Sequence, residues 1–431
     1  MTMHPNKLLP SNLRAVRVLG ALVIAATVAA CGGSKESEEA PTTFAVLTTQ
    51  IAPTPAAVVP TPPDVPVVTS NGKLKIFILA GQSNMEGFGK VDRGGDPDRA
   101  KIVCPLKADG TRSGPANILG GMGSLRAMVN ADPDKYSYLV DSSKTTSYTV
   151  TANVPECTKA DAKTYSSWAT RDDVYISNLS STAPNDNTVK GSGKLGVGFG
   201  ANNEMRNGEG YIGPEFAFGH VVGKGLDDKV LLIKTSWGGK SLAVDFRPPS
   251  SVGLGVGVPD TTSSKTPDVT GVYYSEMVRR VRLVLSDIKK YYPDYDGKGY
   301  EVVGFGWHQG WNDRIDTSYV GQYEVNLANL IRDLRKDLNL PNMLVVIGNT
   351  GLAWAGKDKN SLDLINAQAN VADPIKYPKF AGNVSTVDTR PFHYPDTSPE
   401  IGFVHHWNYS GESYFKVGES MGTAMLKLMK P

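Results

Sequence analysis

The stretch Lys73-Leu-Lys-Ile-Phe-Ile-Leu-Ala80, followed directly by Gly81-Gln-Ser-Asn-Met85, decides the fold that this sequence predicts. Its first part is an almost continuous apolar run that ends at a glycine. Such a run is typical of a strand that is buried on both faces of a sheet. We therefore predict a buried strand over 73–80, followed by a tight turn into a helix near Ser83.

Comparable apolar runs recur along the chain, at 229–235, 301–306 and 343–348. Helical patterns lie between and after these runs, at about 214–225, 272–291, 319–338, 361–372 and 411–429. Apolar strands that alternate with amphipathic helices predict an α/β fold with a parallel sheet covered on both faces. The region from about 90 to 210 lacks this alternation. We interpret it as a long insertion after the first strand, at the carboxyl end of the sheet, where open α/β sheets bind ligands.

The composition excludes several classes of protein. The 431 residues are 40% hydrophobic and 20% charged, with a formal net charge of +2, which is ordinary for a globular protein. A balance this close to neutral argues against a nucleic-acid binder and against a polybasic membrane-surface protein. The 45 glycines and 28 prolines favour many loops over a helical bundle.

The N-terminus has the pattern of an export signal. Lys7, Arg14 and Arg17 precede an apolar run over 18–30 that is too short to span a bilayer. The run ends in Val-Ala-Ala before Cys31 and resembles the bacterial lipobox, which implies that residues 1–30 are removed and that Cys31 is lipidated. The alternative is an ordinary secretory signal that is cleaved elsewhere.

Residues 31–70 are rich in proline and threonine and predict an extended tether, so the folded domain spans 71–431. Taken together, these features predict an exported lipoprotein in the periplasm or at the cell surface, anchored to the outer membrane through its lipid alone. With Cys31 acylated, Cys104 and Cys157 remain as a candidate disulfide, because paired cysteines in exported proteins are commonly oxidised. Two unpaired thiols are the alternative.

The turn after the first strand carries the first chemical signal. A serine at a tight strand-to-helix turn projects its hydroxyl from the top of the sheet, in the manner of a nucleophile elbow. The Gly-x-Ser-x-Gly pattern itself is absent, so taken alone Ser83 could simply belong to a polar turn that caps a helix.

Four further motifs change this balance, because they follow in a fixed order. They are GPEF at 213–216, LIKTSWGGKSL at 232–242, WHQGWND at 307–313 and HWNYSGESY at 406–414. Together with GQSNM, they resemble the SGNH hydrolases, specifically the sialate O-acetylesterase-like group that includes carbohydrate esterase family six. The resemblance covers about 72–430. It implies a three-layer, flavodoxin-like SGNH fold and hydrolysis of O-acetyl esters on carbohydrates.

By this resemblance Ser83 is the nucleophile and His406 its general base. A serine hydroxyl needs a neighbouring imidazole to accept its proton, and histidine can return that proton to the leaving alcohol. His405 competes with His406. The spacing to the Glu-Ser-Tyr of the last helix favours His406.

The orienting acid of the family is missing from its usual place. Many SGNH hydrolases carry an aspartate three residues before the catalytic histidine, where this chain has Phe403, or Gly402 if His405 is the base. Asp388, Asp396 and Glu400 are nearby in the sequence and could substitute. A Ser–His dyad oriented by a backbone carbonyl is the other possibility.

The resemblance also implies three donors to the tetrahedral oxyanion. They are the backbone N–H of Ser83, a backbone N–H in the Trp-Gly-Gly turn, assigned to Gly239, and one side-chain amide. The general Gly-x-Asn-Asp pattern points to Asn312 for that amide, whereas the His-Gln-Gly of the narrower group points to Gln309. Asp313 is expected to be a structural residue that fixes its loop.

Four residues beside these motifs are candidate substrate contacts: Trp237, Arg247, His308 and Trp311. The aromatic rings suit sugar stacking but equally suit ordinary packing. Arg247 could bind an acidic sugar or form a structural ion pair. No metal-binding or nucleotide-binding motif occurs, and no cofactor is implied.

The sequence thus predicts a carbohydrate O-acetylesterase that works through an acetyl-enzyme, with an acetylated carbohydrate as its partner and no nucleic acid. Two rivals stay open. One is a carbohydrate-binding lipoprotein without turnover, which the missing aspartate favours. The other is an esterase for non-sugar esters.

Overall fold

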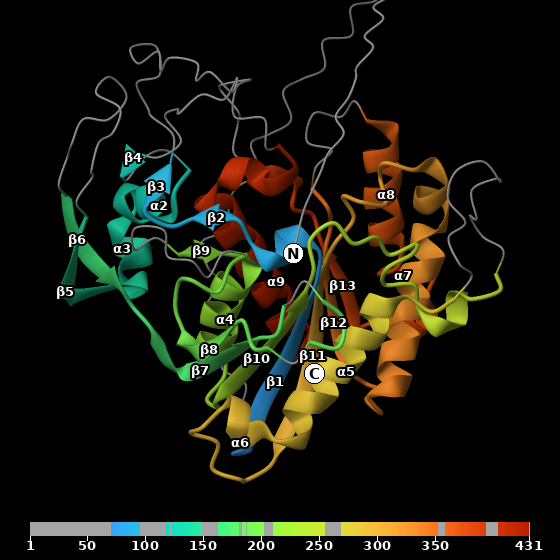
Figure 1. Ribbon diagram of the computed structural model, residues 1–431, viewed down its shortest axis with the longest axis horizontal. Coiled ribbons are helices and arrows are strands. Elements are labelled where there is room, and N and C mark those ends of the chain that lie inside the picture. The colour runs from blue at the N-terminus through green and yellow to red at the C-terminus, as the bar shows by residue number, and fades with distance from the viewer. Residues whose placement is uncertain are drawn as a thin grey trace, which may run out of the picture. The chain divides into compact units, whose positions relative to one another are not determined.

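The computed structural model describes residues 70–94, 118–119, 123–148, 163–180, 183–186, 188–201, 210–254, 269–351, 358–393 and 404–430. Within them a seven-stranded sheet has the order β13-β12-β11-β1-β10-β7-β8 (Figure 1). All neighbouring strands pair in parallel except β8, which runs antiparallel to β7 at one edge. The predicted α/β class with a mainly parallel sheet is confirmed.

The strands of this sheet are β1 (Leu74–Gly81), β7 (Arg171–Asn178), β8 (Gly191–Leu195), β10 (Val230–Ser236), β11 (Tyr300–His308), β12 (Leu344–Gly348) and β13 (Val384–Val387). The four predicted strands correspond to β1, β10, β11 and β12. Strand β1 lies in the middle and is buried along its whole length, as its apolar run requires.

The longer helices are α2 (Leu125–Ala131), α4 (Pro214–Gly225), α5 (Val272–Ser286), α7 (Thr317–Asp337), α8 (Lys359–Asn370) and α9 (Gly411–Leu428). All five predicted helices are present, and one of them is interrupted. Asp287 ends α5, and its side chain accepts a hydrogen bond from the Lys290 N–H at the start of α6 (Ile288–Tyr291).

Helices cover both faces of the sheet, and each face has its own core. Alternate residues of β1 point to opposite sides: Ile76 and Ile78 join the cluster formed with α5, α7 and α8, whereas Phe77 and Leu79 join the cluster formed with α4 and α9. Figure 1 shows these two groups of helices on either side of the strands. The described part of the chain therefore has three layers.

The region from about 90 to 210 contributes more to the sheet than we predicted. We interpreted this region as a long insertion, but its strands β7 and β8 belong to the central sheet beside β10. The sequence of β7, RDDVYISN, begins with polar residues, because this strand lies near the edge. The prediction also missed β13, which has only four residues.

Shorter elements fill the rest of this region and the loops. The strands are β2 (Gly89–Lys90), β3 (Arg93–Gly94), β4 (Ile118–Leu119), β5 (Val140–Tyr148), β6 (Lys163–Trp168) and β9 (Tyr211–Ile212), paired as β2–β9, β3–β4 and β5–β6. The short helices are α1 (Ser83–Glu86) and α3 (Pro133–Tyr136). The 3₁₀ turns lie at Ser137–Leu139, Pro249–Ser251, Pro378–Phe380, Arg390–Phe392 and Val404–Tyr409.

Candidate active site

Three of the sequence motifs meet where neighbouring parallel strands end. Gly81 of β1 is in register with Ser236 of β10 on one side and with His308 of β11 on the other. Backbone hydrogen bonds continue this register into the loops, from Trp237 N to Gly81 O (3.1 Å) and from Gln82 N to His308 O (3.4 Å). The chain builds outward from β1 in both directions, and such a switch point at the carboxyl end of a sheet is a usual ligand site.

Ser83 begins α1 directly after β1 and faces the glycine turn that follows β10. A Cβ placed on Gly238 would lie 3.7 Å from the Cβ of Ser83. Ser83 is buried, and its hydroxyl makes no hydrogen bond with any described residue. Its backbone N–H and that of Gly239 also donate to no group within the described ranges. Within the described ranges, the hydroxyl of Ser83 and the backbone N–H groups of Ser83 and Gly239 are thus all available to a ligand.

The glycine turn requires a glycine at position 239 and is bonded to α1 through Gly238. Gly239 has φ of +69°, in the left-handed region that favours glycine. The N–H of Gly238 donates to the carboxylate of Glu86 (2.8 Å), the last residue of α1. Burial raises the pKa of Glu86, although the charges of Lys190 and Lys234 and the bond from Gly238 oppose this. The sequence analysis gave Glu86 no role.

Gln82 connects the turn before Ser83 to the WHQGWND loop by hydrogen bonds. Its side-chain oxygen accepts hydrogen bonds from Gln309 Nε2 (3.1 Å), Gly310 N (3.1 Å) and Asn312 N (3.3 Å). Sequence reasoning missed this residue, because nothing in the motif GQSNM distinguishes an anchor from a polar turn residue.

The two candidate amides of the WHQGWND loop differ in what they contact. Gln309 is buried, and its Nε2 donates to Gln82, to the Lys240 carbonyl and to Asp313, while its oxygen accepts from Tyr323. Asn312 is half-buried, and its Nδ2 donates to the carbonyl oxygen of Gly239. The amide of Gln309 is therefore fully used inside the protein, whereas Asn312 lies against the glycine turn.

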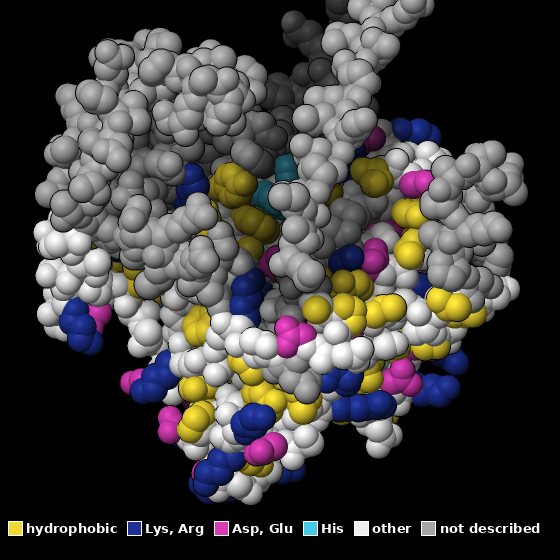
Figure 2. Space-filling model, in the orientation of Figure 1, with side chains coloured by type: hydrophobic (Ala, Val, Ile, Leu, Met, Phe, Trp, Pro, Cys, Tyr) yellow, Lys and Arg dark blue, Asp and Glu magenta, His cyan; other side chains and the backbone are white. Residues whose placement is uncertain are grey.

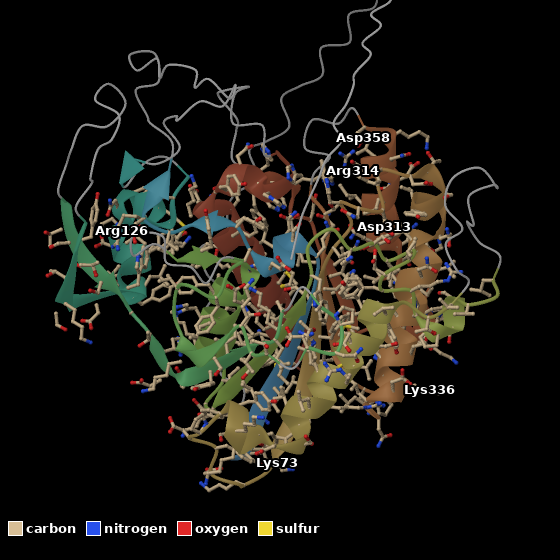
Figure 3. All side chains as sticks on the ribbon, in the orientation of Figure 1. Lys73, Arg126, Asp313, Arg314, Lys336 and Asp358 are labelled. Atoms are coloured by element: carbon tan, nitrogen blue, oxygen red, sulfur yellow. The ribbon has the colours of Figure 1, made fainter. Side chains whose placement is uncertain are left out.

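Asp313 holds the loop that follows the glycine turn. Its two carboxylate oxygens accept from Leu242 N and Ala243 N, both at 2.8 Å, and one also accepts from Gln309 (2.6 Å). The side chain is fully buried, and burial raises its pKa to about 7 despite these hydrogen bonds. This is the loop-fixing contact that we expected of Asp313 (Figure 3).

The adjacent histidines lie next to the nucleophile helix. Asn84, the residue after Ser83, donates to the carbonyl oxygen of His405 (3.0 Å). The ring of Phe88 stacks on His406, with centroids 4.1 Å apart and an interplanar angle of 6°. The structure thus brings Ser83 and this histidine pair into one neighbourhood, and histidine side chains are visible among hydrophobic ones on the face drawn in Figure 2.

The two rings have different surroundings. Burial, reinforced by the nearby charge of His405, lowers the pKa of His406 to about 4. Its Nδ1 is buried without a hydrogen-bond partner. His405 faces the ring of Trp311 with centroids 5.4 Å apart, and burial and the charge of Arg314 lower its pKa.

The candidate acids do not reach His406 within the described residues. Asp388 makes a two-pronged ion pair with Arg390 (2.9 and 2.6 Å) and accepts from Asn349. Burial alone would raise the pKa of Asp388, but the bonds from Arg390 and Asn349 outweigh it and lower the pKa. Glu400 and Asp396 lie outside the described residues, as do Phe403 and Gly402.

The candidate substrate contacts divide into buried and accessible residues. Trp237 is 2% exposed and packs against Tyr273 and Phe246, so its ring belongs to the core. Arg247 is buried and donates to the carbonyl oxygens of Ala243 and Ser251, which makes it a loop anchor.

His308 is buried as well, bonded through Nδ1 to the Gly348 carbonyl (3.0 Å), and burial lowers its pKa to about 4. Trp311 alone of the four is half-buried. The guanidinium of Arg314 lies over the ring of Trp311, 3.6 Å from its centroid. Arg314 also forms an ion pair with Asp358 (2.8 Å; Figure 3).

A buried ion pair contacts the end of α1, the helix that begins at Ser83. Lys234, in β10, donates at 2.8 Å to the Glu86 carbonyl, the Phe199 carbonyl and the carboxylate of Glu215 in α4. Burial lowers the pKa of Lys234 and raises that of Glu215. The GPEF and LIKTSW motifs are thus joined through their charged residues.

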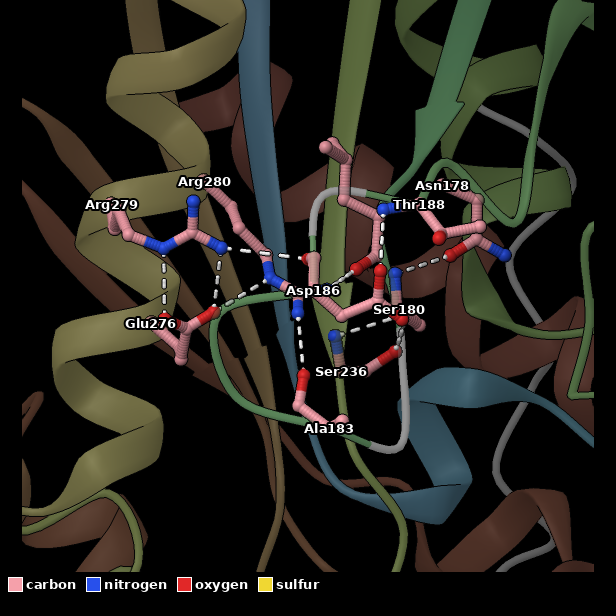
Figure 4. A network of polar contacts seen from close by, with 10 residues as sticks. Asn178, Ser180, Ala183, Asp186, Thr188, Ser236, Glu276, Arg279 and Arg280 are labelled. Atoms are coloured by element: carbon pink, nitrogen blue, oxygen red, sulfur yellow. Dashed lines mark hydrogen bonds and ion pairs between the residues drawn. The ribbon is translucent and has the colours of Figure 1, made fainter.

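A second polar network holds the end of β7 against β10 and α5 (Figure 4). Ser180 and Ser236 share a hydrogen bond between their hydroxyls (2.9 Å). Arg280 bonds Glu276 and the carbonyls of Leu179 and Ala183, and its guanidinium lies 5.0 Å from the ring centroid of Trp237. This network fixes the strand end from which the glycine turn starts.

Several predictions lie on residues that the structure does not describe. These are the signal segment over 1–30, the tether up to residue 69, Cys31, Cys104 and Cys157. Among the described residues, no group of His, Cys, Asp and Glu side chains could hold a metal ion. None of the helices in these ranges has the length and apolar character needed to cross a membrane.

Comparisons with known proteins agree with the motifs. The profile of the family described as carbohydrate esterase, sialic acid-specific acetylesterase matches residues 200–427. No curated protein matched the chain.

Two solved structures are distantly similar. One is a protein from Arabidopsis thaliana (18% identity, TM-score 0.43, 82% of this chain and 98% of that one). The other is a carbohydrate acetylesterase from Xanthomonas citri (13% identity, TM-score 0.36, 72% of this chain), of which the present chain spans about half the length, 49%.

Proposed function

Because this chain belongs to the carbohydrate esterase, sialic acid-specific acetylesterase family, we propose that it hydrolyses O-acetyl esters carried by a carbohydrate. The observation that carries the proposal is the setting of Ser83. Its hydroxyl, which has no partner among the described residues, lies beside the glycine turn, and the nearby Asn84 and Phe88 contact the histidine pair. We assign the three-layer architecture to the SGNH type on the same grounds.

In the proposed first step, Ser83 Oγ attacks the acetyl carbonyl carbon while His406 accepts the hydroxyl proton. The tetrahedral intermediate then expels the sugar oxygen, which takes that proton from His406, and the acetyl group stays on Ser83. A water molecule attacks the acetyl-serine, again giving its proton to His406, and acetate leaves as Ser83 regains its proton. The lowered pKa keeps the ring of His406 neutral at pH 7, and the neutral form is the one that can accept a proton.

The oxyanion would be held by the backbone N–H groups of Ser83 and Gly239 and by the side-chain amide of Asn312. Both backbone groups are unengaged among the described residues. Of the two amides that the sequence left open, Asn312 is favoured, because the Nε2 of Gln309 already has three acceptors. Each such donor is worth roughly 100- to 1,000-fold in rate.

We propose that His406 is oriented by packing rather than by Asp388. The stacked ring of Phe88 fixes the plane of the imidazole, whereas Asp388 is committed to Arg390. Glu400 remains the other candidate from the sequence. Trp311, the accessible aromatic ring beside His405, is the proposed sugar contact.

The experiment that tests this function measures acetate release from acetylated xylan, pectin and other algal and plant polysaccharides and from O-acetylated sialic acid. We expect release from at least one of them, and we expect Ser83→Ala to abolish it. Ser83→Ala should fold normally, because the hydroxyl makes no hydrogen bond with any residue that the structure describes.

The same panel separates the rivals. A folded protein that binds one of these glycans without releasing acetate would be a binding protein. Release from p-nitrophenyl acetate but from no carbohydrate would identify an esterase for non-sugar esters.

We also propose that the mature chain is an exported lipoprotein, on the evidence of the signal-like segment and Cys31 alone. Expression of the full chain in bacteria with labelled palmitate should label the protein and place it in the membrane fraction. Cys31→Ser should lose both properties, and a label that persists in this variant would refute the proposal.

A further inference from the structure

Two hydrogen bonds, one of them buried, join α1, α9 and the histidine segment, which spans Val404–Tyr409. The hydroxyl of Tyr414, in α9, donates to Asn84 Oδ1 (2.8 Å), and Asn84 Nδ2 donates to the carbonyl oxygen of His405 (3.0 Å). Asn84 is 4% exposed and Tyr414 is fully buried. The amide of Asn84 thus has one fixed acceptor and one fixed donor, which leaves it little freedom to turn.

The segment that Asn84 holds has an unusual backbone. Trp407, Asn408 and Tyr409 have φ values of +52°, +51° and +58°, three consecutive left-handed residues without a glycine. Residues in this conformation are strained and persist only where the surroundings hold them. The neighbouring contacts must therefore fix this segment.

The segment is held at both ends. At its start, Asn84 bonds the carbonyl of His405. At its end, Ser410 N donates to the Trp407 carbonyl (2.9 Å), and the Ser410 hydroxyl caps α9 by accepting from Ser413 N (3.0 Å). His406 lies between these two anchors. Its own Nδ1 has no partner among the described residues, where its position depends on the backbone and on Phe88.

We propose that Asn84 is a positioning residue, which, together with Tyr414, sets the place of His406 relative to Ser83. Asn84 follows Ser83 directly, so one short helix carries the nucleophile and the anchor of the base. This contact fixes the main chain beside His406, whereas an orienting carboxylate would fix the imidazole itself. The inference rests on the proposed function, since it concerns the same reaction.

Three variants separate the parts of this contact. Asn84→Ala removes both bonds. Asn84→Asp has the same shape and keeps an acceptor for Tyr414, but its carboxylate cannot donate to the His405 carbonyl. Tyr414→Phe keeps the donor of Asn84 and removes the hydroxyl that fixes Asn84, together with the bond of that hydroxyl to the Phe88 backbone. Asn329→Ala is the matched control, because Asn329 is a buried asparagine of α7 that bonds Ser250 and Ser251 away from the site.

The measurement is the kcat and KM of the full chain for p-nitrophenyl acetate, with the pH dependence of kcat/KM and the thermal unfolding midpoint of each variant. Misplacement of a reacting group by about 1 Å can cost about 100-fold in rate. We expect a kcat loss of that order in Asn84→Ala and Asn84→Asp, with much smaller changes in KM. Tyr414→Phe should lose less, and Asn329→Ala should keep the wild-type kcat even if its midpoint falls.

The pH profile distinguishes positioning from a general loss of stability. If the histidine segment loosens, His406 becomes more solvated, and the acid limb of kcat/KM should move to higher pH in the Asn84 variants but stay in place in Asn329→Ala. An active wild type with Asn84 variants of unchanged kcat would overturn this inference and leave the proposed function standing. A wild type without activity on any acetyl ester would refute both.

Discussion

At the scale of the residue, the proposed chemistry depends on two neighbouring histidines in different environments. His406 lies under the ring of Phe88, while His405 faces Trp311 and the positive charge of Arg314. Burial disfavours the charged form of an imidazole, so the pKa of His406 falls to about 4.

This environment predicts an enzyme that stays active in mild acid. A general base works in its neutral form, so kcat/KM should be constant from neutral pH down to about pH 5 and should fall near pH 4. Phe88→Leu uncovers the ring and should move the acid limb toward the ordinary histidine value of about 6.5. A wild-type limb at that ordinary value would contradict this account of His406.

A paired substitution decides between the two histidines. His406→Gln removes the proposed base, and we expect kcat to fall by at least about 100-fold. His405→Gln should retain most activity. The acid limb of its kcat/KM profile should move to higher pH, because the variant lacks the charge that lowers the pKa of His406. The opposite pattern in the two kcat values would transfer the role to His405.

At the scale of the element, strand β10 contains a charged side chain that is buried in the interior. Lys234 is fully buried, and its three acceptors come from α1, α4 and the loop at Phe199. Removing two charges from water is costly, so the ion pair contributes little to the net free energy of folding. Its larger effect is to specify how β10, α1 and α4 are placed relative to one another.

Removing one member of the pair should therefore destabilise the protein strongly. Lys234→Met leaves the Glu215 carboxylate buried without its partner, and we expect a loss of about 3–5 kcal/mol in the free energy of unfolding. The double variant Lys234→Met/Glu215→Gln should recover a large part of this, because Gln can still accept from the Gly213 N–H. Urea denaturation of both variants measures the effect, and equal losses would contradict the charge argument.

The sequence predicted elements well where the apolar pattern was long and poorly where it was short. β1, β10, β11 and β12 are continuous apolar runs, so their burial could be predicted. β7, β8 and β13 lie toward the edges, where strands are shorter or more polar, and the pattern that marks a buried strand is weak.

The same limit applies to the site. Motifs marked Ser83 at the end of a strand and the histidine pair just before the last helix as candidates, but they could not show which partner each side chain meets. Asp388 stayed a candidate acid in the sequence because the bond to Arg390, two residues away, has no signature. Gln82, Glu86 and Asn84 were unassigned because their roles arise from contacts across more than a hundred residues.

At the scale of the whole molecule, two cores on opposite faces of the sheet give most of the stability, and one of them contains a histidine. His220, in α4, is 3% exposed, meets the ring of Phe216 edge-on with centroids 4.7 Å apart, and has no hydrogen bond on either ring nitrogen. Burial, reinforced by the charge of Arg171, lowers its pKa to about 3.

This histidine should make the protein acid-sensitive. Its pKa is near 6.5 when unfolded and about 3 when folded, so below pH 6.5 the unfolded chain binds a proton that the native one does not. His220 therefore leaves the free energy of unfolding unchanged above pH 6.5. At pH 5, protonation of this histidine in the unfolded chain lowers that free energy by about 2 kcal/mol. His220→Phe should lack this loss. Urea denaturation at pH 7.5 and pH 5 tests it, and an equal pH effect in wild type and variant would refute it.

The central claim, that Ser83 carries the acetyl group during turnover, has one direct test. The wild type and Ser83→Ala are mixed with an acetylated substrate, quenched in acid within milliseconds, digested and analysed by mass spectrometry. We predict an acetyl group on the peptide that contains Ser83 in the wild type, and none in the variant. Release of acetate by the wild type without any acetylated Ser83, together with release by Ser83→Ala, would contradict the account.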